Sequence, residues 1–271
     1  MPGATEPTIE AYGRLFAEHG NTDEAYLGHH FPRYVQTKRR FLSHWDRGRG
    51  NRVLDVGAHW LHQALLYAID GFEVTALDFP VTLDFPSVQA VARAHGIRLL
   101  PNPDLEHPLA LASVPDDSFD VVLFTEIIEH LTFNPVGMWR EIYRVMKPGA
   151  RIVLTTPNYY ALRGNAWSWL RFLRNFGGGI DVPTILTSNT YAHHWKEYGL
   201  RELLYYFGIL SPDFKCLHCA YAEEYHPIYR GKIAGKVVRW AERMVPILRP
   251  DLYLEVELTG KDKGIVVEPH W

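Results

Sequence analysis

Two carboxylates and an imidazole occur together in the segment T-E-I-I-E-H-L, directly after an apolar run. If the chain turns here from a strand into a helix, Glu126, Glu129 and His130 share one helical face, because residues three and four apart are neighbours on a helix. Far downstream, His193 and His194 offer a further ligand. Two Glu and two His around one point would bind a divalent cation and leave positions open for a substrate. The pattern predicts a metal-assisted reaction centre.

The elements that must position these residues follow from the hydrophobic periodicity. Residues 1–50 read as helices, at 9–19 and 34–45, and are expected to form an N-terminal cap or lid. From residue 51 apolar strands alternate with amphipathic helices, which predicts an α/β fold with a mostly parallel sheet covered on both faces. Expected strands are 52–57, 72–78, 97–100, 119–124, 150–156, 214–222 and 252–258; expected helices are 61–69, 88–95, 135–146, 197–207 and 233–248.

The alternation breaks over residues 158–195, which are expected to form an insertion or substrate lid in the domain 51–271. This stretch is rich in aromatic residues and contains Arg163, Arg171 and Arg174. The chain as a whole has 15 Tyr, 13 Phe, 8 Trp and 14 His, so flat amphipathic side chains are abundant. Such side chains either pack in a core and at subunit contacts or provide a stacking surface for sugar rings.

Length, composition and net charge limit the classes of partner and the cellular location that we expect. The 271 residues, 47% of them apolar, are enough for one α/β core. A net charge of −3 disfavours a nucleic-acid partner, since tracking phosphates normally needs a basic groove. We expect no signal peptide and no membrane span, because no apolar run approaches about 20 residues. With only two cysteines, Cys216 and Cys219, the expected location is cytoplasmic.

The order of motifs resembles the class I S-adenosylmethionine-dependent methyltransferases. The resemblance is carried by V-L-D-V-G at 53–57, by E-V-T-A-L-D at 73–78, and by the stretch from F-D-V-V-L-F-T-E-I-I-E-H-L to M-K-P-G-A-R-I-V-L-T-T-P-N. It implies a Rossmann-like, seven-stranded sheet with S-adenosylmethionine beyond the strand ends. The later glycines of the first loop are replaced, since His59 and Leu61 stand there. The implied cofactor-binding residues are Asp55, Gly57, His59, Asp78, Phe79, Asp104, Leu105 and Thr125.

The pattern E-x-x-E-H resembles that of small-RNA terminal 2′-O-methyltransferases and ubiquinone-pathway O-methyltransferases, which resemble metal users. The first group also has a downstream H-x-x-E-aromatic element, and H-W-K-E-Y at 194–198 matches it. The resemblance implies a cation, Mg²⁺ or Mn²⁺, bound by Glu126, Glu129, His130 and His194. The expected catalytic residues are Glu129, His194 and His193; His193 would either support a metal ligand from behind or act as a base.

These expectations combine into an S-adenosylmethionine-dependent O-methyltransferase that acts on a carbohydrate whose neighbouring hydroxyls chelate the cation. Enzymes that methylate bacterial polysaccharides of the methylmannose type look similar in length and layout. Terminal RNA ribose, a phenolic small molecule, or an inert methyltransferase-like protein that binds partners are the alternatives. A small molecule or oligosaccharide is the expected partner, and a homodimer is possible. The acceptor, the hydroxyl, the metal and the need for a separate base stay open.

Overall fold

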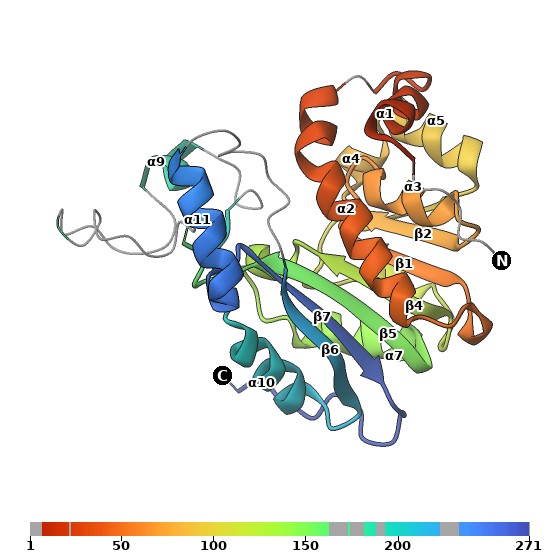
Figure 1. The fold of residues 1–271 in the computed structure, drawn as a ribbon. Helices are drawn as coiled ribbons and strands as arrows, with labels where there is room; N and C mark the ends of the chain where they lie inside the picture. Colours follow the sequence, from red (N-terminus) through yellow and green to blue (C-terminus); the bar gives the residue numbers. More distant parts are fainter. Residues whose placement is uncertain are drawn as a thin grey trace.

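The computed structural model describes residues 7–21, 23–162, 173, 182–187, 193–222 and 233–270. Its centre is one seven-stranded sheet in the order β3-β2-β1-β4-β5-β7-β6 (Figure 1). The first five strands are parallel, and β7 pairs antiparallel with both β5 and β6. The expected mostly parallel sheet is confirmed. The strands are β1 Arg52–Val56, β2 Glu73–Asp78, β3 Arg98–Pro101, β4 Phe119–Thr125, β5 Met146–Pro157, β6 Phe214–Ala222 and β7 Asp251–Leu258.

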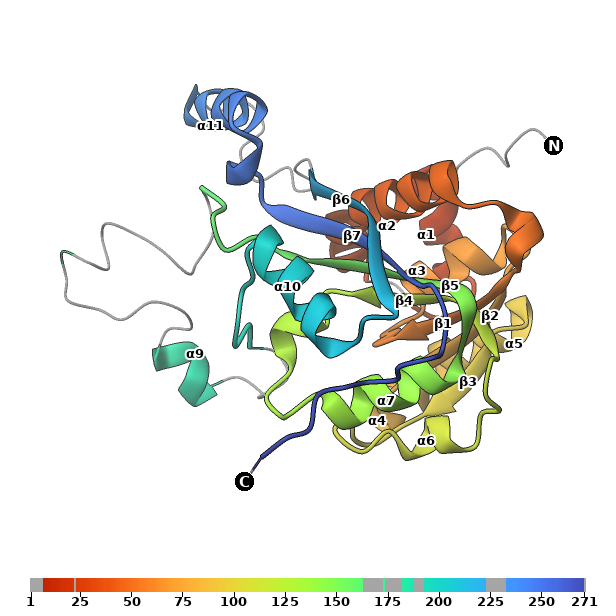
Figure 2. The same ribbon diagram turned by 90° about the horizontal axis from the view of Figure 1, so that it is seen from below.

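Helices cover both faces of the sheet (Figure 2). On one face, α1 to α5 pack on Val53, Val121 and Val153; on the other, α6, α7 and α10 pack on Leu54, Val122 and Leu154. Consecutive residues of a strand thus pack in two separate apolar layers, because side chains alternate between the two faces of a sheet. The helices are α1 Ile9–Ala17, α2 Glu24–His44, α3 His62–Ala68, α4 Pro80–Leu83, α5 Pro86–His95, α6 Leu109–Ala112, α7 Val136–Val145, α9 Val182–Thr187, α10 Leu200–Leu210 and α11 Ile233–Met244, with short 3-10 turns η1 Arg47–Arg49, η2 Ile128–His130 and η4 Pro246–Leu248.

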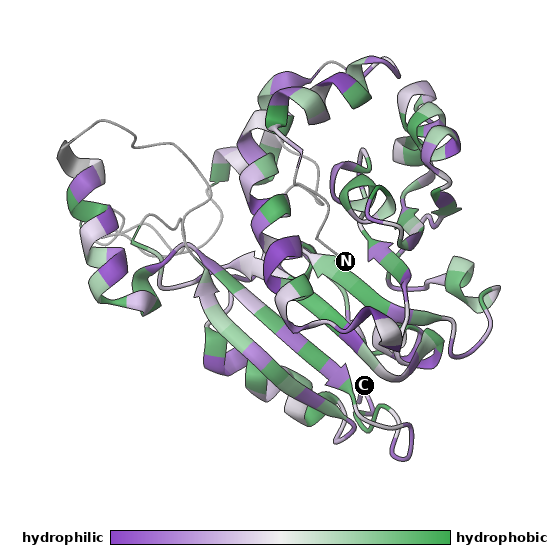
Figure 3. Ribbon diagram, turned by 45° about the vertical axis from the view of Figure 1, so that its right-hand side comes forward, coloured by the Kyte–Doolittle hydropathy of each residue, from purple (hydrophilic) through white to green (hydrophobic). Residues whose placement is uncertain are grey.

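The long helix α2 differs from the expected 34–45, because it already begins at Glu24, where Asp23 caps it by accepting a hydrogen bond from the Tyr26 amide. Its apolar positions face α3 and the sheet, while polar positions are visible on the outer side (Figure 3). The Tyr/His-rich stretch ahead of residue 34 is therefore helical.

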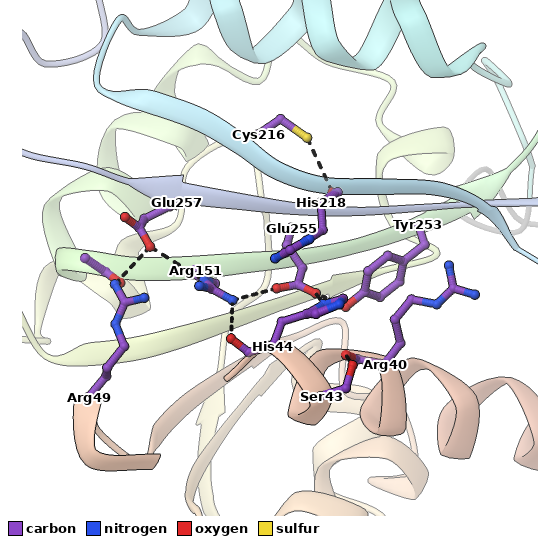
Figure 4. Close-up of polar contacts among 11 residues, drawn as sticks. Arg40, Ser43, His44, Arg49, Arg151, Cys216, His218, Tyr253, Glu255 and Glu257 are labelled. Atoms are coloured by element: carbon purple, nitrogen blue, oxygen red, sulfur yellow. Dashed lines mark hydrogen bonds and ion pairs between the residues drawn. The ribbon is translucent and has the colours of Figure 1, made fainter. Parts of the chain in front are cut away.

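A buried polar network fixes the C-terminal end of α2 on the sheet (Figure 4). Glu255 is fully buried; its Oε2 accepts a hydrogen bond from Arg151 at 2.8 Å, and its Oε1 lies 2.7 Å from His44 Nδ1 and from the Tyr253 hydroxyl. Arg151 also donates to the backbone carbonyl of His44 at 2.9 Å. Buried charges persist only when they are paired, so this network sets where α2 ends.

The predicted insertion falls largely outside the described residues. Arg163, Arg171 and Arg174 lie there, as do Trp167, Trp169 and Tyr191. Within the described part of the chain, no helix has the length and apolar character needed to cross a membrane.

Candidate active site

A cavity of about 870 Å³ opens at the carboxyl ends of the parallel strands. Strand ends and the loops after them form its floor, and the N-terminal half of α2 forms a wall. In an open α/β sheet this edge is where ligands bind. The lining residues used below are Tyr26, His30, Arg33, Tyr34, Asp55, Gly57, His59, His62, Gln63, Asp78, Phe79, Asn102, Leu105, Thr125, Glu126, His130, Phe133, Asn158, His194 and Glu197.

Gly57 is required by packing beneath the cavity. Its φ of +74° lies in the left-handed region, and a Cβ placed there would lie 2.1 Å from Ile127 Cδ1. Only glycine satisfies both conditions. The loop after β1 can therefore sit tightly over the loop after β4, with its backbone at the cavity.

Asp55 supplies a buried acceptor without a partner. The residue is 2% exposed, and its Oδ2 has no hydrogen-bond partner among the described residues. Burial, with a contribution from Asp78, raises the pKa of Asp55 to about 8. Such an orphaned carboxyl fits a ligand that brings a cationic or N–H donor, as the amino-acid end of S-adenosylmethionine does.

Asp78 organises the neighbouring loop with its carboxylate. Oδ2 accepts the His59 amide and Oδ1 the Phe79 amide, both at 2.6 Å. Each oxygen keeps a further lone pair, and Asp78 lines the cavity, so its carboxylate can still accept a hydrogen bond from a ligand hydroxyl. His59 adopts φ +47° and stacks on Trp60 with ring centroids 4.4 Å apart, which explains how a side chain replaces glycine here.

The remaining predicted cofactor residues divide. Leu105 and Thr125 line the cavity, and Thr125 Oγ1 donates to Gln63 Oε1 at 2.9 Å. The Asp104 carboxylate instead accepts the Glu106 amide and lies 2.8 Å from His107 Nδ1, outside the cavity lining.

Sequence reasoning missed several lining residues. Asn102, which is 1% exposed and donates to the Asp104 carbonyl, is one. A group of side chains from α2 and α3 was also missed. The Tyr/His-rich composition of residues 24–34 could have indicated the part of it that lies on α2. The group is Tyr26, His30, Arg33, Tyr34, His62 and Gln63.

The prediction that Glu126, Glu129 and His130 share a helical face is wrong. Glu126 has φ +56° and follows the strand in a bend, and only a single 3-10 turn, η2, comes after it. Its carboxylate pairs with Arg33 at 2.9 Å and accepts the Thr155 hydroxyl at 2.8 Å. Because the strand must turn sharply here, Glu126 leaves the strand toward α2.

Glu129, His130 and His194 do come together. One ligand atom from each lies within 4.8 Å of the others, and the His130 and His194 rings meet edge-on with centroids 4.8 Å apart. The connection is made by the backbone, since the Trp195 amide donates to the Glu129 carbonyl at 2.7 Å. Three of the four predicted ligands therefore converge, although more than sixty positions separate His194 from the other two.

Burial changes the pKa values of this cluster and leaves one carboxyl oxygen in it without a partner among the described residues. Glu129 is fully buried and its Oε1 has no partner in the described structure, while Oε2 accepts the Thr156 hydroxyl. Burial, followed by the nearby Glu126, raises the pKa of Glu129 well above its usual range. Burial, followed by His194, lowers the pKa of His130 to about 4, so its ring is neutral at pH 7.

His193 has a different place. It is 3% exposed, its Nε2 lies 3.1 Å from the Thr184 carbonyl, and it is not part of the cavity lining. Its own carbonyl accepts from His130 Nδ1 at 3.0 Å. That bond fixes the tautomer of His130 and leaves Nε2 with its lone pair facing Glu129 Oε1, 3.9 Å away.

Glu197 joins the site without having been predicted. It lines the cavity, its Oε1 lies 3.7 Å from His194 Nδ1, and its buried Oε2 has no partner among the described residues. The match of H-W-K-E-Y to a family element was the signal that contained it. The Glu197 carboxylate can take the ligand position that was predicted for Glu126, whose carboxylate pairs with Arg33 instead.

Comparison with known proteins gives a consistent result. A family model described as a methyltransferase domain matches residues 27–204. A ubiquinone biosynthesis O-methyltransferase of Xanthomonas oryzae pv. oryzae is 30% identical over 151 residues, which are 55% of this chain and 56% of the relative. A probable S-adenosylmethionine-dependent methyltransferase of Mycolicibacterium smegmatis is 34% identical over 113 residues, 41% of this chain and 40% of the relative. The chain spans about half the length of the curated relatives it matches.

Solved structures share the fold. A chain from the complex between the Haloferax volcanii Trm112 methyltransferase activator and the putative methyltransferase aligns with a TM-score of 0.57 at 15% identity, covering 95% of this chain and 100% of that one. A SAM-dependent methyltransferase from Archaeoglobus fulgidus aligns with a TM-score of 0.52 at 19% identity, covering 83% and 94%. The expected Rossmann-like fold is confirmed, and the chain belongs to the methyltransferase domain family.

Proposed function

We propose that the protein is an S-adenosylmethionine-dependent O-methyltransferase whose acceptor is a carbohydrate hydroxyl bound next to a divalent cation. One observation carries the proposal: a single cavity joins the strand-end residues Asp55 and Asp78 to His130 and His194. A methyl donor and an oxygen nucleophile must lie in one enclosed space for in-line transfer. The curated relatives named as O-methyltransferases support oxygen as the acceptor atom.

The chain's own residues divide the work between the two ends of the cavity. Asp55 would bind the amino-acid end of S-adenosylmethionine and Asp78 its ribose, while the tight Gly57 turn brings backbone groups to the ligand. When bound, S-adenosylmethionine supplies a methyl group on an electrophilic sulfonium.

Glu129, His130 and His194 would hold the cation, with Glu197 as the fourth ligand in place of Glu126. We propose Glu126 as the partner of Arg33 that fixes the wall of the cavity beside this site. Carboxylate with imidazole is a set that Mg²⁺ and Mn²⁺ accept, and Mn²⁺ suits the imidazoles better. A bound cation lowers the pKa of a coordinated hydroxyl and orients it. A separate base role for His193 stays a prediction.

The acceptor class rests on the cavity wall. Tyr26, Tyr34 and Phe133 offer aromatic surface on which a sugar ring packs. The net charge of −3 disfavours the RNA alternative, and a phenol or an inert binding role stays as an outcome of the test. The cap role of residues 1–50, the cytoplasmic location and a homodimer also stay predictions, although α2 provides one wall of the cavity.

The test combines binding with turnover. Calorimetry should show S-adenosylmethionine binding, and mass spectrometry should show transfer of one methyl group to a member of a panel of sugars, RNA 3′ ends and catechols. EDTA should abolish transfer, and Mn²⁺ or Mg²⁺ should restore it. Absence of cofactor binding would reject the enzyme reading; full activity in EDTA would reject the cation.

The cation ligands are tested by His130→Ala. Removing a ligand should lower turnover about a hundredfold and leave S-adenosylmethionine affinity within about twofold, since losing even a residue that only orients a metal ligand typically costs about 10–100-fold. His107→Ala is the matched control, because His107 also sits beside a carboxylate, at 2.8 Å from Asp104, but outside the cavity. Equal turnover of the two variants would contradict the assignment.

A further inference from the structure

The helix α11 presents its apolar side to solvent. Val237, Trp240 and Met244 recur at helical spacing and form what we call the apolar stripe; they are 59%, 65% and 65% exposed. On the opposite side, Gly235 is buried and Glu242 is only 5% exposed. In a globular protein, the apolar side of a surface helix normally faces the core and its polar side faces solvent. The stripe is therefore available to a partner.

Basic residues flank the stripe. Lys236 and Arg243 are exposed, and Arg239 is partly exposed. Among the side chains described in α11, Glu242 is the single acidic one, and it faces inward. The helix thus presents positive charge and apolar surface together, although the whole chain has a net charge of −3.

The segment that follows the stripe contacts a residue of the cavity lining. In two views α11 stands outside the layers that cover the sheet (Figures 1 and 2). Apolar exposure continues from α11 through Val245 and Ile247 to Leu162, whose amide donates to the Leu248 carbonyl. Asn158, which lines the cavity, donates to the Ile247 carbonyl at 2.8 Å.

We propose that α11 binds an anionic lipid surface, with the apolar stripe inserted at the headgroup boundary and Lys236, Arg239 and Arg243 against the headgroups. A helix with Trp and aliphatic residues on one side and basic residues beside them lies in such an interface. A second copy of the chain is a poorer occupant, because a symmetric contact through α11 would bring the same cations together. The proposal goes beyond methyl transfer and does not depend on it.

The test uses the full chain without cofactor or metal. It should co-sediment with phosphatidylcholine vesicles that contain phosphatidylglycerol, and much less with phosphatidylcholine alone. Trp240→Ser should remove most binding. Lys236→Gln and Arg243→Gln should each weaken binding about fivefold, because a basic residue near an anionic surface contributes about that factor. High salt should weaken binding in the same direction.

Matched controls make the result decisive. Val81→Ser in α4 also removes an exposed apolar side chain, which is 74% exposed, and should leave vesicle binding unchanged. All variants should unfold at the temperature of the parent, since the altered residues are on the surface. No binding of the parent to anionic vesicles, or equal binding of Trp240→Ser and Val81→Ser, overturns the proposal. A lipid-free dimer in sedimentation velocity that Trp240→Ser dissociates also overturns it, in favour of a second copy. Because no step uses S-adenosylmethionine, failure here leaves the proposed activity untouched.

Discussion

Replacing Asp55 by Asn should stabilise the free protein while weakening cofactor binding. Burial raises the pKa of Asp55 from 3.8 to about 8, so at pH 7 the folded protein holds a proton that the unfolded chain has lost. When folding raises the pKa of a group, the free energy of unfolding falls as the pH rises from the unfolded-state pKa to the folded-state pKa. For Asp55 this range is about pH 4 to 8, and the fall is about 1.4 kcal/mol per pH unit. At pH 7 the free energy of unfolding is therefore lower by about 4 kcal/mol than it is below pH 4.

The Asn side chain does not ionise, and it has nearly the same shape as the Asp side chain. Asp55→Asn should therefore match the parent near pH 4 and gain about 2–4 kcal/mol at pH 7, a rise in Tm of about 5–10 °C for a chain of this size. Thermal unfolding from pH 4 to 8 measures the difference, and calorimetry should show that S-adenosylmethionine binds at least tenfold more weakly.

Asp120→Asn is the control for this prediction. Asp120 is equally buried, at 2%, but accepts the Arg52 amide and pairs with Lys147 at 2.6 Å. Its substitution should destabilise at pH 7, because it breaks a charge pair. The reasoning is refuted if Asp55→Asn has the same pH profile as the parent or unfolds at a lower temperature at pH 7.

Two further predictions concern packing and charge beside the site. Gly57→Ala should cost about 2–4 kcal/mol, because it adds overpacking against Ile127 to left-handed strain, and Ile127→Val should recover part of the loss. Gly71→Ala, with φ +84° and open space, should cost only about 1 kcal/mol in the same unfolding assay; equal costs would contradict the clash. Arg33→Met should cost about 3 kcal/mol, because it leaves the partly buried Glu126 carboxylate without its cation, and adding Glu126→Gln should recover most of the loss. The exposed Arg52–Glu73 pair is the control, and a loss for Arg52→Met as large as for Arg33→Met would argue against burial as the cause.

The strands β1, β2, β4, β5 and β7 could be predicted because each contains a buried apolar run, whereas the edge strands β3 and β6 are only partly buried. The observed ends of all seven lie within a few residues of the expected ones. Even Met146–Pro157, which begins earlier than expected, keeps its apolar part at 150–156. The two carboxyls Asp55 and Asp78 were placed correctly at the cavity because strand ends in a parallel sheet meet at one edge.

Local periodicity could not reveal the turn at Glu126. Its spacing to Glu129 is compatible with a helix, but the backbone there is left-handed and held by Arg33 and Thr155, which are distant in sequence. Asp104 lies outside the cavity lining for a local reason, since its carboxylate accepts the Glu106 amide and lies beside His107. Its predicted contact with the cofactor stays a prediction. Glu197 and Arg33 join the site only through tertiary contacts.

The helix α2 has a consequence for how this fold can be rearranged. Its side chains contact carboxylates at three levels: Arg33 pairs with Glu126, Lys38 pairs with Asp70 at 2.6 Å, and His44 Nδ1 lies 2.7 Å from Glu255 Oε1. In a chain that began at residue 51, Glu126 would lose Arg33 and Asp70 would lose Lys38, whereas Glu255 would keep Arg151. The cavity would also lose one wall. The first fifty residues thus belong to the same packed domain as the cavity, and a replacement segment would have to supply new partners for Glu126 and Asp70.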